Sequence, residues 1–456
     1  MVTTRHQALR PVEDLARLVK GDPRLLNRAL QRLDDVQIAL QIDNLSSEGQ
    51  DTVLQAVAVD RRATVLGFTR YETAADVLRR LAPEEAAAII DEFESDDAAD
   101  VLQEMDAGQL RAILQRLDPE GIQEIEDLLT YDPNSAGGIM NTEAVRVHDE
   151  VTVGEIRRIV QETPNLPDHV FYVYVVDEDE RLVGLVRLRE LVVSVSDTPV
   201  REVMQTELVS VTPDTDQEEV ADLASRYDVV ALPVVDAQRR LLGVVTIDDI
   251  VDVLREEATE DILKMAGAGE ALSDTRDFMA SFRARFPWLL GAAVGGLLVA
   301  TSLAGFDDAL RAVPALALFM PVVAGMGGNV GTQSSTVVVR GLAVGYVERS
   351  QLFRLILREV ALGASLGLIS GVFIGTVALF LGIDAPDPVL LGVVITGGLV
   401  GSMSIAALVG TSVPLLLERF NVDPAVATGP FVTTAVDVLG LLFYFLLASW
   451  LLGVAS

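Results

Sequence analysis

Apolar and polar positions divide this chain into two parts near residue 280. Beyond that point, five apolar runs of at least 18 residues follow one another, near 286–304, 312–339, 352–381, 389–417 and 425–452. A helix of about 20 apolar residues is long enough to cross a bilayer. Five such runs are too many for a soluble core, so the pattern predicts a membrane domain with five helical spans.

The first 130 residues show a different pattern, with short amphipathic segments separated by Pro and Gly, as in small helices. One unit, AADVL, occurs at Ala74–Leu78 and again at Ala98–Leu102, a spacing of 24 residues. A repeat of that length predicts stacked helical hairpins that form a small superhelix.

A longer repeat follows this helical part. Residues 140–147 (MNTEAVRV) recur as 204–211 (MQTELVSV), and residues 175–184 (VVDEDERLVG) recur as 234–243 (VVDAQRRLLG). Each copy predicts a strand, a helix, a strand, an Asp-containing turn, a strand and a helix. Over residues 138 to about 255 this layout resembles a tandem CBS pair, an α/β fold whose two units form one regulatory disc that often binds adenosyl compounds or ions.

Charge is distributed as unevenly as hydrophobicity. Of the 35 Lys and Arg and 67 Asp and Glu, only 8 and 9 lie from position 281 on, which leaves a net charge of −31 in the first 280 residues. Such an acidic surface argues against nucleic-acid binding, because phosphates require the opposite sign, and favours contact with cations. Cys is absent, which excludes disulfides and thiolate metal sites. The polar, acidic N-terminus is not a secretory signal and is expected to stay in the cytosol.

Basic residues between the predicted spans indicate how the chain crosses the membrane. Arg283 and Arg285 precede the first span, and the remaining basic residues are concentrated at the second and fourth connections. Those connections carry Arg340, Arg349, Arg354, Arg358 and Arg419, whereas the first and third carry Asp307, Asp308, Arg311, Asp384 and Asp387. The positive-inside rule therefore predicts a cytoplasmic N-terminus and an external C-terminus.

Asp437 lies near the middle of the last apolar run. An ionised Asp at that depth costs about 2.5–3.5 kcal/mol and normally faces protein, water or a cation. A proton relay or a structural pair with a buried Arg is one interpretation. The Arg residues of the membrane region all fall near predicted helix ends, so a cation is the simpler partner.

Polar residues also recur within the second apolar run. Asn329, Thr332, Gln333 and Thr336 follow helical spacing, and Gly residues between them allow another helix to approach closely. Interhelical hydrogen bonding is one interpretation of these residues. A permeation pathway is the other, and the density of polar groups, together with Asp437 in another span, favours it. Carboxylate, amide and hydroxyl oxygens prefer hard cations, and magnesium, which keeps its waters, needs fewer protein ligands than calcium.

A third polar feature precedes the membrane domain. Residues 248–261 (DDIVDVLREEATED) contain seven acidic residues. On a helix, Asp249, Asp252, Glu256 and Glu260 fall within an arc of roughly 80°. A solvated helix face is the ordinary explanation of such a stripe. Cation binding is the other, because this helix leads directly towards the first span and the preceding domains are also acidic.

Two motifs, residues 321–333 (PVVAGMGGNVGTQ) and 429–437 (GPFVTTAVD), together with the order of the domains, resemble the MgtE family of bacterial magnesium channels over essentially the whole chain. The resemblance implies a multidomain membrane protein of the bacterial inner membrane. Its expected parts are an all-α N domain (1–137), an α/β CBS pair (138–202 and 203–247), an acidic connecting "plug" helix (248–280) and a five-helix α transmembrane domain (281–456).

The resemblance also implies site residues. A homodimer would hold a hydrated magnesium ion between its two copies of Asp437, with Asn329, Gly325 and Thr433 lining the same pore. A cytosolic magnesium sensor would use Asp96, Asp100, Asp216, Glu218, Asp228, Asp249, Asp252, Glu257, Glu260 and Asp261. In the CBS pair, Tyr172 and Arg189 would contact ATP, although Val229 and Val230 stand where a second ring is expected.

These observations predict a homodimeric magnesium channel that closes when cytosolic magnesium binds its acidic domains. One alternative is a divalent-cation transporter driven by a proton or sodium gradient. Another is a membrane-anchored CBS sensor, which would have no use for a polar face and a carboxylate within its spans. An enzyme is the least favoured class, because the sequence offers no nucleophile–base pair, phosphate-binding Gly loop with a following Lys, or metal-hydrolase motif.

Overall fold

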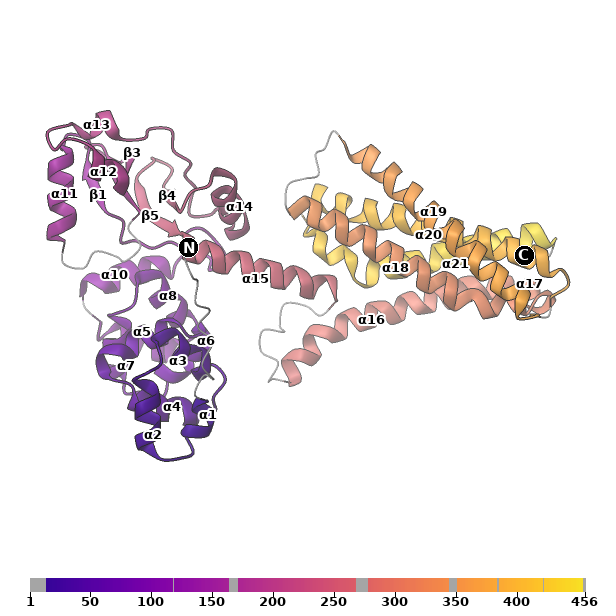
Figure 1. The fold of residues 1–456 in the computed structure, drawn as a ribbon, viewed down its shortest axis with the longest axis horizontal. Helices are drawn as coiled ribbons and strands as arrows, with labels where there is room; N and C mark the ends of the chain where they lie inside the picture. Colours follow the sequence, from indigo (N-terminus) through magenta and orange to yellow (C-terminus); the bar gives the residue numbers. More distant parts are fainter. Residues whose placement is uncertain are drawn as a thin grey trace, which may run out of the picture. The chain divides into compact units, whose positions relative to one another are not determined.

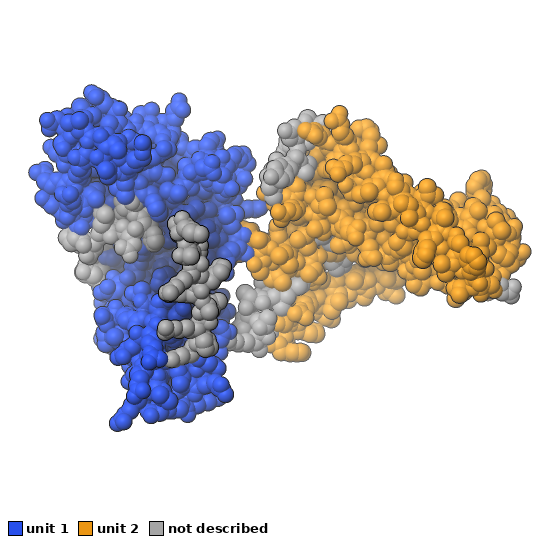
Figure 2. All heavy atoms as spheres, viewed as in Figure 1, with its two compact units in different colours: residues 1–255 blue, residues 256–456 orange. Residues whose placement is uncertain are grey.

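A computed structural model of the chain describes residues 14–117, 119–163, 171–267, 278–343, 351–383, 385–420 and 422–453. Arg349 and Asp384, which entered the topology prediction, lie outside these ranges. The chain forms two compact units, residues 1–255 and 256–456 (Figure 2). The predicted multidomain architecture, with its helical, α/β and membrane-type parts, is confirmed.

The N-terminal part of the first unit is helical (Figure 1). Its described helices are α1 (Leu15–Leu18), α2 (Pro23–Leu30), α3 (Asp35–Ile42), α4 (Ser47–Ala56), η1 (Val59–Arg61), α5 (Arg62–Gly67), α6 (Tyr71–Leu78), α7 (Pro83–Ile90), α8 (Ser95–Gln103), α9 (Ala107–Leu114) and α10 (Pro119–Leu128). Side chains of Asp22, Asp34 and Asp106 accept hydrogen bonds from the first free backbone N–H groups and so start three of them. Both copies of the repeat are helical, in α6 and α8, and their Ala, Val and Leu side chains are buried. All of them lie in the core of this part except Ala99, which packs in the core of the CBS part.

The CBS part contains β1 (Arg146–His148), α11 (Val153–Glu162), β2 (Tyr172–Val176), β3 (Leu182–Arg187), α12 (Leu188–Val193), α13 (Val200–Val203), α14 (Gln217–Tyr227), β4 (Ala231–Val235) and β5 (Leu241–Thr246). β1 pairs in parallel with β2, which pairs antiparallel with β3, and β4 pairs antiparallel with β5. The first copy matches the predicted order. In the second copy the first strand is reduced to one bridge between Val211 and Val234, because Pro213 follows and has no N–H to extend the pairing.

Helix α15 (Ile247–Met265) follows β5 directly, so the acidic run is helical as predicted. Thr246 precedes it, and its hydroxyl donates to Asp249 at 2.7 Å and also contacts Asp248. The helix ends before Gly267, whose φ of 66° lies in the left-handed region that favours glycine.

The membrane part contains α16 (Phe278–Leu303), η3 (Ala304–Phe306), α17 (Asp307–Ala312), α18 (Ala315–Ala343), α19 (Leu352–Phe380), α20 (Pro388–Arg419), η5 (Pro424–Thr428) and α21 (Pro430–Leu452). Among the described residues, five helices are long and apolar enough to cross a membrane, which confirms the predicted number. The first helix begins at Phe278, eight residues before the predicted span.

The predicted fifth span, 425–452, is wrong as one continuous helix. It divides at Gly429 into η5 and α21, and Pro430 is the first residue of α21. Pro fits there because the N–H groups of the first turn have no partner within the helix, so the N–H that Pro lacks costs no hydrogen bond. Pro430 therefore starts α21 and does not interrupt a helix.

Candidate functional site

The predicted polar face of the second span is present on α18. Gly325, Asn329, Thr332, Gln333 and Thr336 are all exposed on the isolated chain. The other side of the helix is buried, with Gly327, Gly328 and Gly331 among its buried residues. Because lipid cannot satisfy amides and hydroxyls, this exposed polar face requires water, an ion or another protein surface.

Helix α21 packs against the buried glycines of α18. A Cβ added at Gly328 would lie 3.6 Å from Thr433, and one at Gly327 would lie 3.2 Å from Val436. The hydroxyl of Tyr444, one of the buried side chains of α21, donates to the carbonyl of Leu316 at 3.2 Å and ties the other end of α21 to α18. The tertiary structure therefore brings the two sequence motifs together.

Asp437 follows Val436 on α21 and is half-buried. Thr433 lies one turn before it, and its hydroxyl donates to the carbonyl of Gly429 at 3.2 Å. The ion pairs formed among the described residues of this unit involve Lys264 and Arg311 and leave Asp437 out. A carboxylate without a basic partner is thus held one residue beyond the contact between α18 and α21.

The first unit holds a group of carboxylates that we call the acidic cluster. It is made of Glu94, Asp96 and Asp97 at the start of α8, and Asp248, Asp249 and Asp252 at the start of α15. These side chains line a cavity of about 760 Å³, together with Arg62, Tyr71 and Phe93. Asn141 donates to Glu94 at 2.6 Å and to Asp96 at 3.4 Å, and so fixes one edge of the cluster.

Burial and mutual repulsion act on the acidic cluster. Asp96 is buried, and its burial, followed by the charge of Asp249, raises its pKa well above the usual range. Burial raises the pKa of Asp97 to about 6, with a further contribution from Glu94, and burial raises that of Asp249 to about 7. The buried carboxylates of the cluster therefore hold protons more readily than separate, solvated carboxylates would, and a positive charge near them would relieve their mutual repulsion.

The predicted sensor residues fall into three groups. Asp96, Asp249 and Asp252 line the cavity, and Asp100 lies near enough to act electrostatically on Tyr71. Asp216 caps α14 by accepting from the N–H of Glu218 at 2.9 Å, and Asp228 ends the same helix in a left-handed conformation. Glu257, Glu260 and Asp261 belong to the second unit.

In that second unit, Lys264 pairs with Glu260 and with Asp423, the latter at 2.8 Å. Burial and the charge of Asp423 raise the pKa of Asp261. Within the described ranges, no three acidic or His side chains are close enough to form a ready metal centre. The assignment of these residues as metal ligands stays a prediction.

Sequence reasoning did not single out Glu94, Asp97 and Asp248 of the acidic cluster, nor Asp423. Asp97 and Asp248 could have been found, because each is the neighbour of a predicted ligand in an Asp-Asp pair at the start of a helix. Glu94 immediately precedes α8 and Asp423 lies in a connection, and only the tertiary structure brings Glu94 to Asn141 and Glu143, and Asp423 to Asp261.

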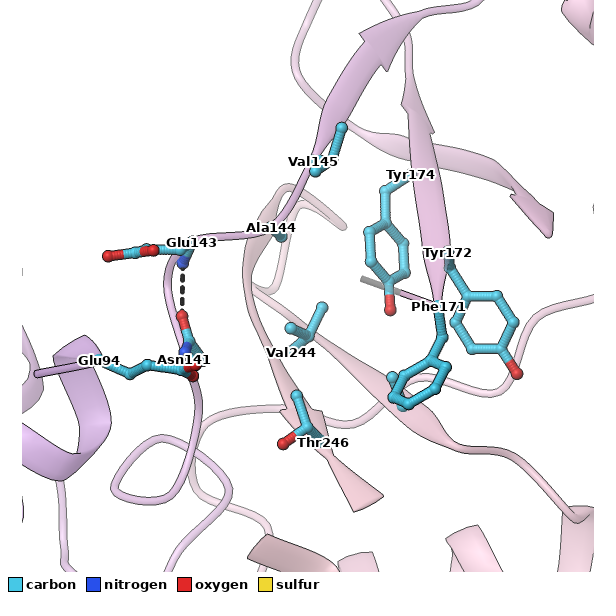
Figure 3. A pocket seen from close by; sticks show the side chains of 11 residues that line it. Glu94, Asn141, Glu143, Ala144, Val145, Phe171, Tyr172, Tyr174, Val244 and Thr246 are labelled. Carbon is cyan, nitrogen blue, oxygen red and sulfur yellow. Dashed lines mark hydrogen bonds between the residues drawn. The ribbon is translucent and has the colours of Figure 1, made fainter. Parts of the chain in front are cut away.

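Tyr172 lines a cavity of about 30 Å³ beside Phe171 and Tyr174 (Figure 3). The buried hydroxyl of Tyr174 has no hydrogen-bond partner among the described residues. Arg189 is not part of this lining; it pairs with Glu190 at 2.9 Å, and its side chain is 78% exposed. The space holds little more than one water molecule, so an adenine ring would require the aromatic side chains to move.

We expect the contact between α8 and α15 to weaken as pH rises in the absence of metal. Folding raises the pKa of Asp97 from 3.8 to about 6 and that of Asp249 to about 7. The unfolded chain therefore loses these protons first, and stability falls between about pH 4 and pH 7, by about 3 kcal/mol for Asp97. Hydrogen exchange of α8 and α15 in chelator at pH 5 and pH 8, corrected for intrinsic rates, measures the change.

Magnesium should restore protection at pH 8 and have less effect at pH 5, where protons already neutralise Asp96, Asp97 and Asp249. Helix α4 begins after the uncharged N-cap Ser46 and contributes no residue to the acidic cluster. It therefore supplies an internal control for general effects of pH on exchange. Equal protection of α8 and α15 at both pH values in chelator would contradict this prediction.

Comparison with known proteins adds an independent result. Residues 320–447 match the MgtE divalent cation transporter family, residues 33–134 match the MgtE intracellular N domain, and residues 136–197 and 200–256 each match the CBS domain. The chain is 41% identical over 337 residues to the magnesium transporter MgtE of Thermus thermophilus, covering 73% of this chain and 74% of that protein. The chain belongs to the MgtE family.

A second MgtE magnesium transporter, from Bacillus subtilis, is 38% identical over 326 residues, which cover 71% of each chain. Among solved structures, the chain is similar to the cytosolic domain of the Mg²⁺ channel MgtE in complex with ATP. The identity is 38% and the TM-score 0.49, over 52% of this chain and 97% of that one. Membership of the MgtE family confirms the resemblance inferred from residues 321–333 and 429–437.

Proposed function

We propose that this MgtE family member is a magnesium channel of the bacterial inner membrane, and not an enzyme. The carrying observation is that α18, whose glycines pack on α21, presents an exposed polar face within a membrane span, while α21 carries the half-buried Asp437. All the polar groups offered there are carboxylate, amide or hydroxyl, which suit a hard cation. Its relatives are named magnesium transporters, and that supports magnesium as the ion.

The channel acts as a homodimer in this proposal. Gly325, Asn329 and Thr332 lie on a helix face that is exposed in a single chain, although it belongs to a membrane span. A second copy covers this face and leaves a wet path between the two chains. Each copy contributes one Asp437, and a magnesium ion that keeps its waters is held between them.

The acidic cluster is the sensor in this proposal, supported by its cavity and its raised pKa values. When cytosolic magnesium is high, the ion neutralises carboxylates of α8 and α15 and stabilises their contact. When it is low, repulsion between these carboxylates separates the N domain from the CBS pair. Helix α15 leads on to Asp261 and Lys264, and Lys264 reaches Asp423 just ahead of η5 and α21.

Reconstituted vesicles that contain a magnesium-sensitive dye test this function. A channel takes up magnesium along the magnesium gradient when proton and sodium gradients are collapsed, and it gives single-channel currents in a planar bilayer. Uptake that requires a proton or sodium gradient would favour the coupled transporter. Absence of any uptake, with intact folded protein, would favour a membrane-anchored sensor.

ATP binding in the CBS pair stays a prediction. Tyr172 and the unpartnered Tyr174 hydroxyl face one small cavity, which supports ATP binding, whereas Arg189 lies outside the cavity lining and pairs with Glu190.

The predicted orientation, with a cytoplasmic N-terminus and an external C-terminus, also forms part of the proposal. Its support is that Arg340, Arg354 and Arg358 lie at the helix ends assigned to the cytoplasmic side.

A further inference from the structure

Glu359 is a second carboxylate within the membrane spans, and the proposed ion path does not use it. It is the eighth residue of α19, about 10 Å from the start of the helix, and its exposed fraction is only 7%. Neighbouring Arg354 and Arg358 are exposed and take part in none of the described ion pairs of this unit. The described partner of Glu359 is Ser334 of α18, whose hydroxyl donates to Oε2 at 3.0 Å.

The position of Glu359 on α19 is set by close packing. Gly363, Gly367, Gly371 and Gly375 continue from Glu359 at intervals of four, and all are buried. A Cβ at Gly363 would lie 2.5 Å from the carbonyl oxygen of Met403, and one at Gly371 would lie 2.7 Å from Cα of Thr396. This seam fixes α19 against α20, so Glu359 extends from a rigid pair of helices.

Ser334 lies at the back of the polar face of α18. At about 100° per residue it is roughly 160° around the helix from both Thr332 and Thr336. Ser334 is 4% exposed, whereas Thr332 and Thr336 are exposed on the isolated chain. The hydrogen bond from Ser334 to Glu359 therefore joins α18 to α19 on the side of α18 that faces away from the proposed ion path.

We propose that Glu359 is a positioning residue that holds α18 through Ser334 and so fixes the direction in which the polar face of α18 points. A carboxylate suits this role because a buried acceptor without a donor is costly. The helix arrangement in which Ser334 donates to Glu359 is therefore strongly favoured. A residue of the glycine seam has no group that reaches α18. The inference rests on the proposed function, since the face that Glu359 orients is the proposed wall of the ion path.

The experiment uses the full-length protein in vesicles and exploits the absence of Cys. Thr332→Cys supplies a single thiol on the polar face, and its rate of modification by a charged methanethiosulfonate reports how that face is presented. In this background we would make Glu359→Leu, Ser334→Ala, both together, and Glu359→Gln. Ser365→Ala is the matched control, because Ser365 is exposed on the same helix and bonds to the carbonyl of Ala361.

Glu359→Leu and Ser334→Ala should each change the modification rate of the thiol introduced at position 332 roughly three- to twentyfold, the range of hydrogen bonds between membrane helices. The double variant should show no larger change than either single variant, because both remove one interaction. Glu359→Gln, whose amide oxygen still accepts from Ser334, should restore the parent rate, and Ser365→Ala should keep it. Ser334→Ala tests the same bond if Glu359→Leu does not fold.

Unchanged modification in Ser334→Ala and Glu359→Leu would overturn the positioning role, and so would additive effects in the double variant. Magnesium uptake is measured in separate vesicles with the same variants made in the chain that keeps Thr332, and the maximal rate and half-saturating concentration are determined separately. The positioning role predicts a fall in maximal rate that Glu359→Gln reverses. If the parent protein takes up no magnesium while the thiol pattern holds, the proposed function fails and the positioning role stands.

Discussion

Replacing Asp437 with Ala is expected to abolish magnesium uptake while the protein stays folded. The carboxylate is half-buried on α21 beside the packed glycines of α18, and none of the described ion pairs in its unit includes it. An ionised Asp at this depth costs about 2.5–3.5 kcal/mol, and a bound cation offsets that cost. Without the carboxylate the cation loses this stabilisation, which corresponds to a fall in uptake of roughly a hundredfold. Dye-loaded vesicles with equal amounts of variant and parent protein give the measurement.

Two further variants separate charge from shape at this position. Asp437→Asn keeps the size and removes the charge, and it should fail as completely as Asp437→Ala. Asp308→Asn removes one acidic charge from exposed α17 and should leave uptake within about twofold, because a fully solvated charge contributes little. Near-normal uptake by Asp437→Asn would show that the negative charge is not what the ion requires.

The second large effect is expected in the acidic cluster. In the parent protein, millimolar magnesium should protect residues 1–270 from protease and slow uptake. Asp96→Asn with Asp249→Asn should be protected without magnesium and respond little when it is added, because amides neither repel one another nor hold the ion. Loss of a charge-assisted contact costs about 1.5–3 kcal/mol, so the magnesium dependence of cleavage should fall at least roughly tenfold. Limited proteolysis in proteoliposomes across a magnesium series measures it.

A charge-matched control accompanies this variant. Glu178→Gln with Asp197→Asn removes the same number of charges from exposed positions of the same unit, outside the cluster. It should retain the magnesium-dependent protection of the parent. If both double variants lose the dependence equally, the total charge of the unit governs closure and the acidic cluster has no special part in it.

Much of the candidate site could be predicted from local sequence. Helical spacing placed Asn329, Thr332 and Thr336 on one face, and α18 presents them as expected. The error at the fifth span had a local cause, since hydropathy does not distinguish η5 from α21 and Pro430 could be interpreted either as a kink or as a first residue. Pro at the first position of a helix is common and could have been recognised.

The acidic cluster was harder to predict from the sequence. Asp216 and Asp228 have the right chemical type, but both end up at the termini of α14, where Asp216 caps the helix. Glu94 became a neighbour of Asn141 and Glu143 through folding, although no motif marks it. Carboxylates are frequent in this chain, so residue type alone could not separate the cluster from the solvated surface.

The sequence by itself determined the order of the domains, the five spans and the need to compensate Asp437. These follow from hydropathy, from periodicity and from the cost of a charge in lipid, each of which acts within a single segment. Only the tertiary structure decided that α21 packs on the glycines of α18, that Asp96 meets Asp249, and that Glu359 meets Ser334. Those pairs join segments far apart in the chain, and the contact of complementary surfaces is not encoded by either segment alone.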